Sequence, residues 1–186
     1  MKGARRQATI LLSGGVDSAA CAHLLQAQRF TVGAVYIDYG QSAVNQESKA
    51  ASSLANHFGI ELHRLQLAGA GEFESGEVVG RNAFLILSTL LLTRGKAPVI
   101  AVGLHSGTPY YDSSESFVAS LSKLLSEHTD GRVTLLAPFA TWTKRDVYAY
   151  FVATEIPLTL TYSCEVGVMP VCGRCRSCKD RKILEC

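Results

Sequence analysis

The sequence lacks a hydrophobic run long enough to cross a membrane. Its most apolar stretch, residues 83–92, contains Ser and Thr and is about half as long as the roughly 20 residues that span a bilayer. The amino-terminal segment is basic, but only residues 10–12 follow it as an apolar run, which is too short for a signal peptide. These absences predict a cytoplasmic protein with no membrane partner.

The sequence also lacks an excess of charge of either sign. Its 186 residues include 18 Lys and Arg against 16 Asp and Glu, for a net charge of +2. Charge alone therefore indicates neither a nucleic-acid surface nor a membrane surface. Hydrophobic residues make up 47% of the chain and charged residues 18%, which excludes a disordered chain and supplies the core of one domain.

Cysteines are scarce outside one cluster near the C-terminus. Two of the six, Cys21 and Cys186, stand alone, and the other four are Cys164, Cys172, Cys175 and Cys178. A secreted disulfide scaffold spreads its cysteines along the chain, so this crowding predicts thiolates that bind one metal in a reducing compartment. The spacing C-x7-C-x2-C-x2-C offers the four ligands that Zn²⁺ prefers. An iron–sulfur cluster is the alternative, because short cysteine spacing also suits it. A closed four-thiolate zinc site predicts a structural role, because no coordination position remains for catalysis.

Strand and helix patterns alternate along the chain. Short apolar runs predict strands at 8–12, 31–38, 60–67, 98–103 and 132–137. Helical spacing predicts helices at 18–28, 42–58, 82–94, 113–128 and 144–154, with a shorter one at 179–184. The helix at 82–94 is so apolar that we expect it to be buried on more than one side.

This alternation predicts an α/β fold, a doubly wound parallel sheet with helices on both faces. Such sheets bind ligands outside the carboxyl ends of their strands, at the topological switch point. We expect residues 1–160 to form this domain and residues 161–186 to form a zinc-binding motif packed on it.

The first predicted strand ends in the string L-L-S-G-G-V-D-S, residues 11–18. Two glycines let backbone N–H groups approach an anion, and the N-terminus of the following helix adds a partial positive charge. Ser13 and Ser18 offer hydroxyls to phosphate oxygens, and Asp17 can hold Mg²⁺ or cap the helix. An ordinary strand-to-helix turn has a similar composition. The string is not a Walker A loop, because it lacks the Gly-Lys-Ser/Thr ending.

The S-G-G-x-D-S string resembles the PP-loop of the N-type ATP pyrophosphatases. That resemblance implies an adenine nucleotide alpha hydrolase-like, Rossmann-like fold that binds ATP. The nucleotide-binding residues that it implies here are Leu12, Ser13, Gly14, Gly15, Val16, Asp17, Ser18 and Ala19.

The order of the motifs is similar to that of the 7-cyano-7-deazaguanine synthase family of the queuosine pathway. After the PP-loop come D-Y-G-Q at 38–41, G-R-N at 80–82 and the four-cysteine motif. The resemblance implies an ATP-dependent carbon–nitrogen ligase that adenylates the carboxylate of 7-carboxy-7-deazaguanine. Ammonia would then displace AMP to give an amide, and a second activation would dehydrate the amide to the nitrile. The cofactors implied are ATP, Mg²⁺ and Zn²⁺.

The candidate catalytic residues are Asp17, Arg81 and Lys144. Lys144 resembles a family lysine that would neutralise phosphate charge, although a solvated helix residue is the alternative. Arg81 and Asn82 stand at a loop-to-helix junction, where Arg can meet phosphate or substrate and Asn can bind nucleotide or merely cap the helix. Asp38, at the end of the second strand, is a candidate for adenosine or magnesium, or a simple turn acid. His105, after the fourth strand, is a further site candidate.

One loop departs from the family pattern. Where the family carries D-x-S-G-Y-P-D-C-R, this chain has a shorter, divergent loop at 103–115, in which the Cys-Arg pair becomes Ser113-Ser114. If the missing Arg holds the deazaguanine acid, Arg at position 114 should improve use of that acid.

This departure leaves two other functions open. One is a divergent PP-loop enzyme that passes a deazaguanine-type acid to another acceptor, such as an amine, a protein or a nucleic acid, including within antiviral defence. The other is a non-catalytic nucleotide-binding module. A protein acceptor and a homodimer are the partners that the sequence leaves open beside the small acid and ammonia.

Overall fold

Five parallel strands form a single sheet in the order β3-β2-β1-β4-β5. The computed structural model describes residues 6–69, 71, 73 and 76–184. The strands are β1 (Gln7–Leu11), β2 (Thr31–Asp38), β3 (Leu62–Gln66), β4 (Val99–Ala101) and β5 (Thr134–Leu136). The order reverses beside β1, which has β2 on one side and β4 on the other, so this is the switch point of the sheet.

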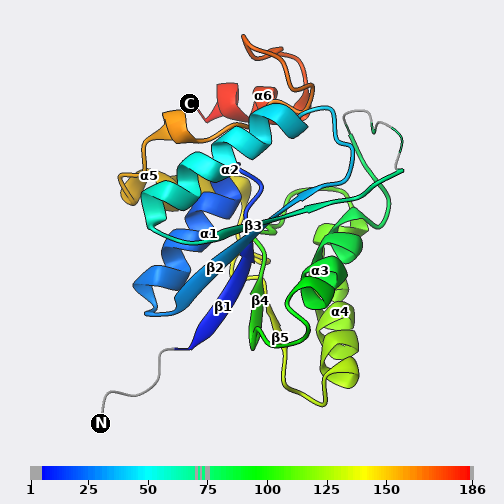
Figure 1. Cartoon of the computed structure of the whole chain (residues 1–186). Helices are drawn as coiled ribbons and strands as arrows, with labels where there is room; N and C mark the ends of the chain where they lie inside the picture. The colour runs from blue at the N-terminus through cyan, green and yellow to red at the C-terminus, as the bar shows by residue number, and fades with distance from the viewer. Residues whose placement is uncertain (1–5, 70, 72, 74–75, 185–186) are drawn as a thin grey trace.

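Helices cover both faces of the sheet, as Figure 1 shows. One layer consists of α1 (Val16–Ala27), α2 (Val44–Phe58) and α5 (Lys144–Ala153), and the other of α3 (Arg81–Leu92) and α4 (Glu115–His128). Two short 3-10 turns, Tyr111–Ser113 and Leu158–Leu160, interrupt the connections. The predicted doubly wound α/β fold is therefore confirmed.

The alternation of side chains along β1 divides the core into two clusters. Ile10 and Leu12 pack in the cluster under α1, α2 and α5, whereas Leu11 packs in the cluster under α3 and α4. Successive residues of a strand point to opposite faces, so a short apolar strand fills both layers. This explains why the strand signal of the N-terminal run is continuous rather than alternating.

The prediction for the helix at 82–94 is wrong about its burial. Within α3 only Asn82, Ile86 and Thr89 are buried, and Leu91 remains 80% exposed. The helix lies on the outside of the sheet and contacts β1 and β4. One stripe of side chains is therefore fully buried, and neighbours such as Phe84 and Leu87 are only partly covered. Its apolar composition exceeds what this position buries.

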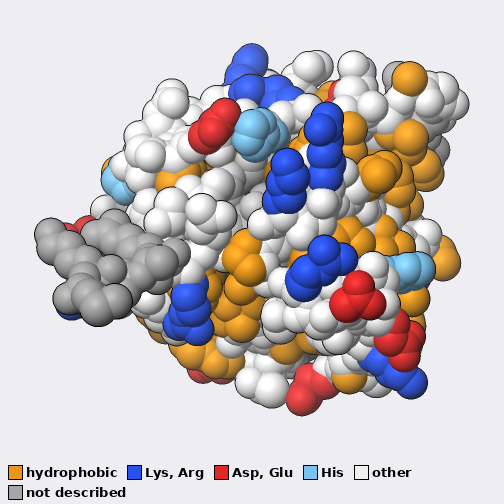
Figure 2. Space-filling model, turned by 60° about the horizontal axis from the view of Figure 1, so that its bottom comes forward, with side chains coloured by type: hydrophobic (Ala, Val, Ile, Leu, Met, Phe, Trp, Pro, Cys, Tyr) orange, Lys and Arg blue, Asp and Glu red, His pale blue; other side chains and the backbone are white. Residues whose placement is uncertain are grey.

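The surface at the amino ends of the strands carries no field of one charge. Figure 2 shows basic, acidic and apolar side chains interspersed there, as the net charge of +2 suggests. Among the described helices, none is long and apolar enough to cross a membrane.

The C-terminal segment packs on the start of α2 and on the glycine turn after β1. Tyr162, Cys164 and Cys178 form a third apolar cluster with the N-cap Ala43 and with Ala50 of α2. The Tyr162 backbone N–H donates to the Gly14 carbonyl at 2.9 Å. The last helix, α6 (Arg176–Ile183), begins earlier than the predicted 179–184, because the Cys175 sulfur caps it. Cys186 lies outside the described residues.

Candidate functional site

A cavity of about 340 Å³ opens at the carboxyl ends of β1, β2 and β4, next to the switch point. Its walls come from the loop after β1, the end of β2, the starts of α2, α3 and α5, the segment after β4 and the C-terminal segment. Small-molecule sites typically occupy about 300–1,000 Å³, so the cavity is large enough for a nucleotide-sized ligand.

The glycine turn after β1 is fixed by its contact with α2. Gly14 has φ +88°, and a Cβ there would lie 2.8 Å from both the Ala50 Cβ and the Glu47 carbonyl oxygen. A side chain at position 14 is therefore excluded by conformation and by space. Gly15 has φ −85° and lines the cavity, so its lack of a side chain matters for ligand approach.

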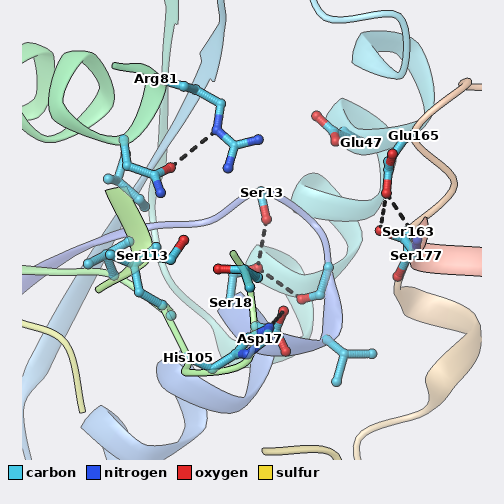
Figure 3. A pocket seen from close by; sticks show the side chains of 18 of the residues that line it. Ser13, Asp17, Ser18, Glu47, Arg81, His105, Ser113, Ser163, Glu165 and Ser177 are labelled. Carbon is cyan, nitrogen blue, oxygen red and sulfur yellow. Dashed lines mark hydrogen bonds and ion pairs between the residues drawn. The ribbon is translucent and has the colours of Figure 1, made fainter. Parts of the chain in front are cut away.

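The first turn of α1 faces this cavity without a side-chain cap. Gly15 is the N-cap residue, and no side-chain hydrogen bond caps the helix, so Asp17 does not act as its cap. The Ser18 hydroxyl donates to the Gly15 carbonyl at 2.9 Å, and the Ser13 hydroxyl donates to the Ser18 hydroxyl at 3.3 Å (Figure 3). The first N–H groups of a helix lack intrahelical partners, which makes this turn suited to an anion.

Lys144 contacts the Asp17 carboxylate inside the cavity. Its Nζ donates to Asp17 Oδ1 at 2.7 Å and to Oδ2 at 2.6 Å, and its side chain is only 30% exposed. A capping box between Thr143 and Asp146 fixes the start of α5, where Lys144 is the first residue. The alternative of a solvated helix residue is therefore wrong.

His105 is the third charged or titratable group at this point. Its Nε2 lies 3.8 Å from Asp17 Oδ2, with a side chain 12% exposed. The chain reaches this position through Gly103, where a Cβ would lie 2.6 Å from the Asp17 carbonyl oxygen. The close packing of these two backbone segments holds His105 beside Asp17.

Arg81 and Asn82 lie at the start of α3, on the opposite side of the cavity opening. Gly80, with φ +77°, is the N-cap and no side chain caps the helix, so the alternative role of Asn82 as a helix cap is wrong. Asn82 instead ties α3 to the loop before α4, since its Nδ2 donates to the Asp112 carbonyl at 2.9 Å. Arg81 Nε donates to Asn82 Oδ1 at 3.2 Å, which leaves the guanidinium facing the cavity.

Three predicted nucleotide-binding residues lie outside the described lining of the cavity. The Asp38 carboxylate accepts from the Gly40 N–H at 3.0 Å and from Gln66 Nε2 at 3.2 Å, so it acts here as a turn acid. Ala19 is fully buried within α1, and Gly14 packs against α2. The predicted residues that do line it are Leu12, Ser13, Gly15, Val16, Asp17, Ser18, Arg81, Asn82, His105 and Lys144.

Glu47 lines the cavity and was not predicted from the sequence. Gln41 Nε2 donates to Glu47 Oε2 at 2.9 Å, and burial raises the pKa of the Glu47 carboxyl above its usual range, against the opposing effects of this hydrogen bond and of Arg81. Glu47 stands four residues before Ala51 and seven before Leu54, which are buried in α2. A charged residue on the apolar stripe of a helix is the sequence signal that could have found it.

The divergent loop contributes Ser113, not Ser114, to the cavity. Ser113 is buried and lines the cavity, whereas the Ser114 hydroxyl accepts from the Phe117 N–H at 3.1 Å and caps α4. Ser114 is absent from the described lining. The expectation that Arg at position 114 would face the substrate is therefore wrong.

Replacing Ser114 with arginine should destabilise the fold without improving the site. Loss of an N-cap side chain typically lowers the free energy of unfolding by about 0.5–2 kcal/mol, and the new side chain would start outside the cavity. Urea denaturation measures the first effect, with Ser120→Arg on the exposed side of α4 as the matched control. An improved rate with 7-carboxy-7-deazaguanine in Ser114→Arg alone would contradict this placement.

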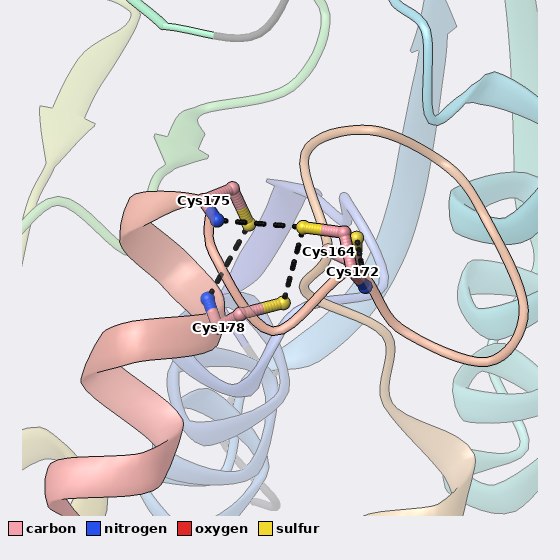
Figure 4. A group of neighbouring side chains, drawn as sticks. All are labelled: Cys164, Cys172, Cys175 and Cys178. Atoms are coloured by element: carbon pink, nitrogen blue, oxygen red, sulfur yellow. Dashed lines mark hydrogen bonds between the residues drawn. The ribbon is translucent and has the colours of Figure 1, made fainter.

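The four predicted ligand cysteines converge at one point, shown in Figure 4. Their Sγ atoms all lie within 4.8 Å of one another. Backbone N–H groups of Cys172, Cys175 and Cys178 each donate at 3.4 Å to the sulfur of the preceding cysteine of the group. Four sulfurs that close and surrounded by N–H donors suit thiolate ligands of a metal. The lone Cys21 is fully buried, and burial raises its pKa to about 12, as expected for a packing residue.

The cysteine motif also forms one wall of the cavity. Arg176, Ser177, Asp180 and Arg181 of α6 line it, and Glu165 Oε1 accepts from the Ser177 N–H and hydroxyl at 3.0 and 2.8 Å. Arg176 also donates to the Gly107 carbonyl at 2.8 Å. The cysteine motif therefore positions the residues of α6 that line the cavity, and Arg176 links it to the divergent loop.

Solved structures with the same fold include a tRNA thiolase and an NMN synthetase. The U34-tRNA thiolase NcsA from Methanococcus maripaludis, solved with its [4Fe-4S] cluster, has a TM-score of 0.63 at 16% identity over 97% of this chain and 65% of its own. NMN synthetase from Francisella tularensis has a TM-score of 0.55 at 13% identity, covering 90% of this chain and 69% of its own. These likenesses confirm the fold.

Sequence relatives cover nearly the whole chain. A 7-cyano-7-deazaguanine synthase from Synechococcus elongatus is 32% identical over 96% of this chain and 91% of its own length. One from Methanothermobacter thermautotrophicus is 29% identical over 95% and 92%. The family model described as "Queuosine biosynthesis protein QueC" matches residues 7–79 and 70–183. The chain belongs to this QueC family of enzymes, as the order of its motifs predicts.

Proposed function

We propose that this chain uses ATP to convert 7-carboxy-7-deazaguanine and ammonia into 7-cyano-7-deazaguanine. Family membership supports the substrate and product. The observation that carries the ATP-dependent chemistry is the Lys144 ammonium, bonded to Asp17 beside the uncapped start of α1 and within the cavity. A cation and backbone N–H groups that meet there suit a phosphate group.

The proposed reaction needs two activations of the same carbon. A carboxylate oxygen attacks the α-phosphorus of ATP and pyrophosphate leaves. Ammonia then attacks the carboxyl carbon, a proton is lost, and AMP leaves to give the amide. The amide oxygen then attacks the α-phosphorus of a second ATP and pyrophosphate leaves. Loss of AMP and of the two remaining N–H protons gives the nitrile. The protein's task is to position two anions and stabilise the charge at phosphorus.

The chain's own residues divide this task. The Ser13 and Ser18 hydroxyls and the first N–H groups of α1 would bind pyrophosphate oxygens, and Lys144 would neutralise charge on the transferring phosphoryl group. Asp17 keeps the Lys144 ammonium at the turn before ligands bind. Its carboxylate would also supply an oxygen ligand to Mg²⁺ beside the phosphate turn, and that ion would neutralise triphosphate charge.

We propose zinc as the metal of the four-cysteine site. A Zn–S bond of about 2.3 Å puts neighbouring sulfurs of a tetrahedral site about 3.8 Å apart. The Cys172 and Cys178 sulfurs lie 3.9 Å apart, and all four lie within 4.8 Å. That spacing supports one ion, because a cubane of four irons would hold its ligands further apart. Zinc here would hold residues 161–186 as a structural motif against the domain of residues 1–160.

The reaction is tested by its products. Protein, ATP, Mg²⁺, 7-carboxy-7-deazaguanine and ammonium should yield the nitrile and AMP, identified by mass spectrometry. Absence of AMP formation with this acid would overturn the proposal.

A second outcome of this assay favours a different acceptor. The divergent loop places Ser113 against the cavity, where the family pattern has a Cys, so the lining of the site differs there from that pattern. Adenylate without amide or nitrile would indicate an enzyme that passes the activated acid to an acceptor other than ammonia.

A further inference from the structure

Glu47 presents a carboxylate to the cavity that the ATP chemistry leaves without a role. It comes from the first turn of α2 and lines the cavity together with Tyr36, Tyr39 and Gln41 from the end of β2 and the following turn. The Lys144 and Asp17 pair belongs to the other end of the lining, at the starts of α1 and α5. The site therefore has a second polar centre besides the phosphate turn.

A hydrogen bond from Gln41 fixes the orientation of the Glu47 carboxylate. The buried Gln41 side chain accepts from the Tyr39 N–H at 2.9 Å through Oε1, which turns its Nε2 toward Glu47. The same Nε2 also lies 3.1 Å from the Tyr36 hydroxyl. Glu47 Oε2 is thus held by Gln41, whereas Oε1 accepts no hydrogen bond within the part of the chain that the structure describes.

A fixed carboxylate selects ligands by their pattern of donors. An ionised carboxyl group only accepts hydrogen bonds, so its complement is an edge with two adjacent donors. The pyrimidine ring of a deazaguanine has such an edge, formed by N1–H and the 2-amino group. Adenine instead places its amino donor beside the N1 acceptor, whose lone pair a carboxylate repels. Glu47 therefore matches the acid substrate and not the base of ATP.

The opposite wall suits the other end of the same ligand. In Figure 3 the Arg81 and Glu47 side chains lie on either side of the opening above Ser13. Arg81 offers N–H donors in a fork that matches a carboxylate. A ligand with paired donors at one end and a carboxylate at the other complements this pair of charges.

We propose that Glu47, oriented by Gln41, recognises the 2-amino-4-oxopyrimidine edge of the deazaguanine acid and sets the base specificity of the enzyme. The choice of ligand rests on the proposed function. Glu47 contacts the substrate in this proposal but takes no part in the transfer of the adenylyl group.

Two acids and one substitution test the assignment. The probes are 7-carboxy-7-deazaguanine and the analogue that lacks only its 2-amino group, each titrated calorimetrically with Mg²⁺ and the uncleavable α,β-methylene analogue of ATP. Wild-type protein should bind the complete acid more tightly, because hydrogen bonds to a charged group change affinity by about 10- to 150-fold. In Glu47→Gln this preference should collapse, while the affinity for the ATP analogue stays at its wild-type value.

The controls separate the two proposals. Glu61→Gln replaces a glutamate whose side chain is 78% exposed and should keep the wild-type preference. Equal binding of the two acids by wild-type protein, which needs no variant to fold, would overturn the role of Glu47, as would an unchanged preference in folded Glu47→Gln. Wild-type protein that binds neither acid and forms no AMP would instead overturn the proposed function itself.

Discussion

Replacing Lys144 with alanine should slow AMP formation by about 10²- to 10³-fold, the usual effect of removing one group that stabilises transition-state charge. Lys144 bonds to both oxygens of Asp17 at the phosphate turn, so its ammonium is already in place when the triphosphate binds. The free energy of unfolding should change by only about 1 kcal/mol or less, since partly exposed ion pairs contribute little. Pre-steady-state AMP formation and urea denaturation, measured on the same samples, report the two effects.

The matched control is Lys123→Ala on α4. The Lys123 side chain is 77% exposed and lies 3.8 Å from Glu127, so its loss should alter neither rate nor stability. A purely structural role for Lys144 predicts the reverse pattern, with a large loss of stability and a proportionate loss of rate. Near-normal AMP formation by folded Lys144→Ala would remove the central support for the phosphate chemistry.

The layered fold could be predicted because its signals are local. The strand Thr31–Asp38 has the bounds that its apolar run predicts, and Gly59, with φ +64°, ends α2 where the sequence places a stop. Helix α3 shows the limit of such patterns. Composition reports how apolar a helix is, but the exposure of Leu91 depends on how many neighbours the sheet provides.

Site residues that belong to a local sequence motif could be predicted, whereas those that tertiary contacts bring to the site could not. The string at 11–18 and the four cysteines each lie close together in sequence, so their function is readable there. The contact between Lys144 and Asp17 joins residues 127 positions apart, and resemblance to a family supplied both partners without the bond between them. The places of Glu47 and of the Ser114 cap depend on the packing of α2 and α4. Glu47 was therefore not predicted, and position 114 was wrongly expected to face the substrate.

Replacing Cys175 with serine should remove the metal and most of the activity together. Its sulfur is one of four within 4.8 Å and also caps α6, the helix that brings Arg176 and Asp180 to the cavity. Metal binding to a structural site of this kind contributes about 10–16 kcal/mol in isolated zinc-finger peptides, far more than the packing of an eight-residue helix. We therefore expect loss of one equivalent of zinc by elemental analysis and fast amide hydrogen exchange across 161–184.

The comparison that isolates the metal is Cys21→Ala. Cys21 is fully buried in α1, away from the cluster, so this variant should keep one equivalent of zinc and slow exchange in α6. The strands lie in other core clusters, so in Cys175→Ser their amides should stay protected while the cavity wall loses protection. Iron and acid-labile sulfide in wild-type protein would show that the site holds an iron–sulfur cluster and would contradict the assignment of zinc. Unchanged amide hydrogen exchange across 161–184 in metal-free Cys175→Ser would show that this segment keeps its structure without any metal. That result would contradict the structural role proposed for the site.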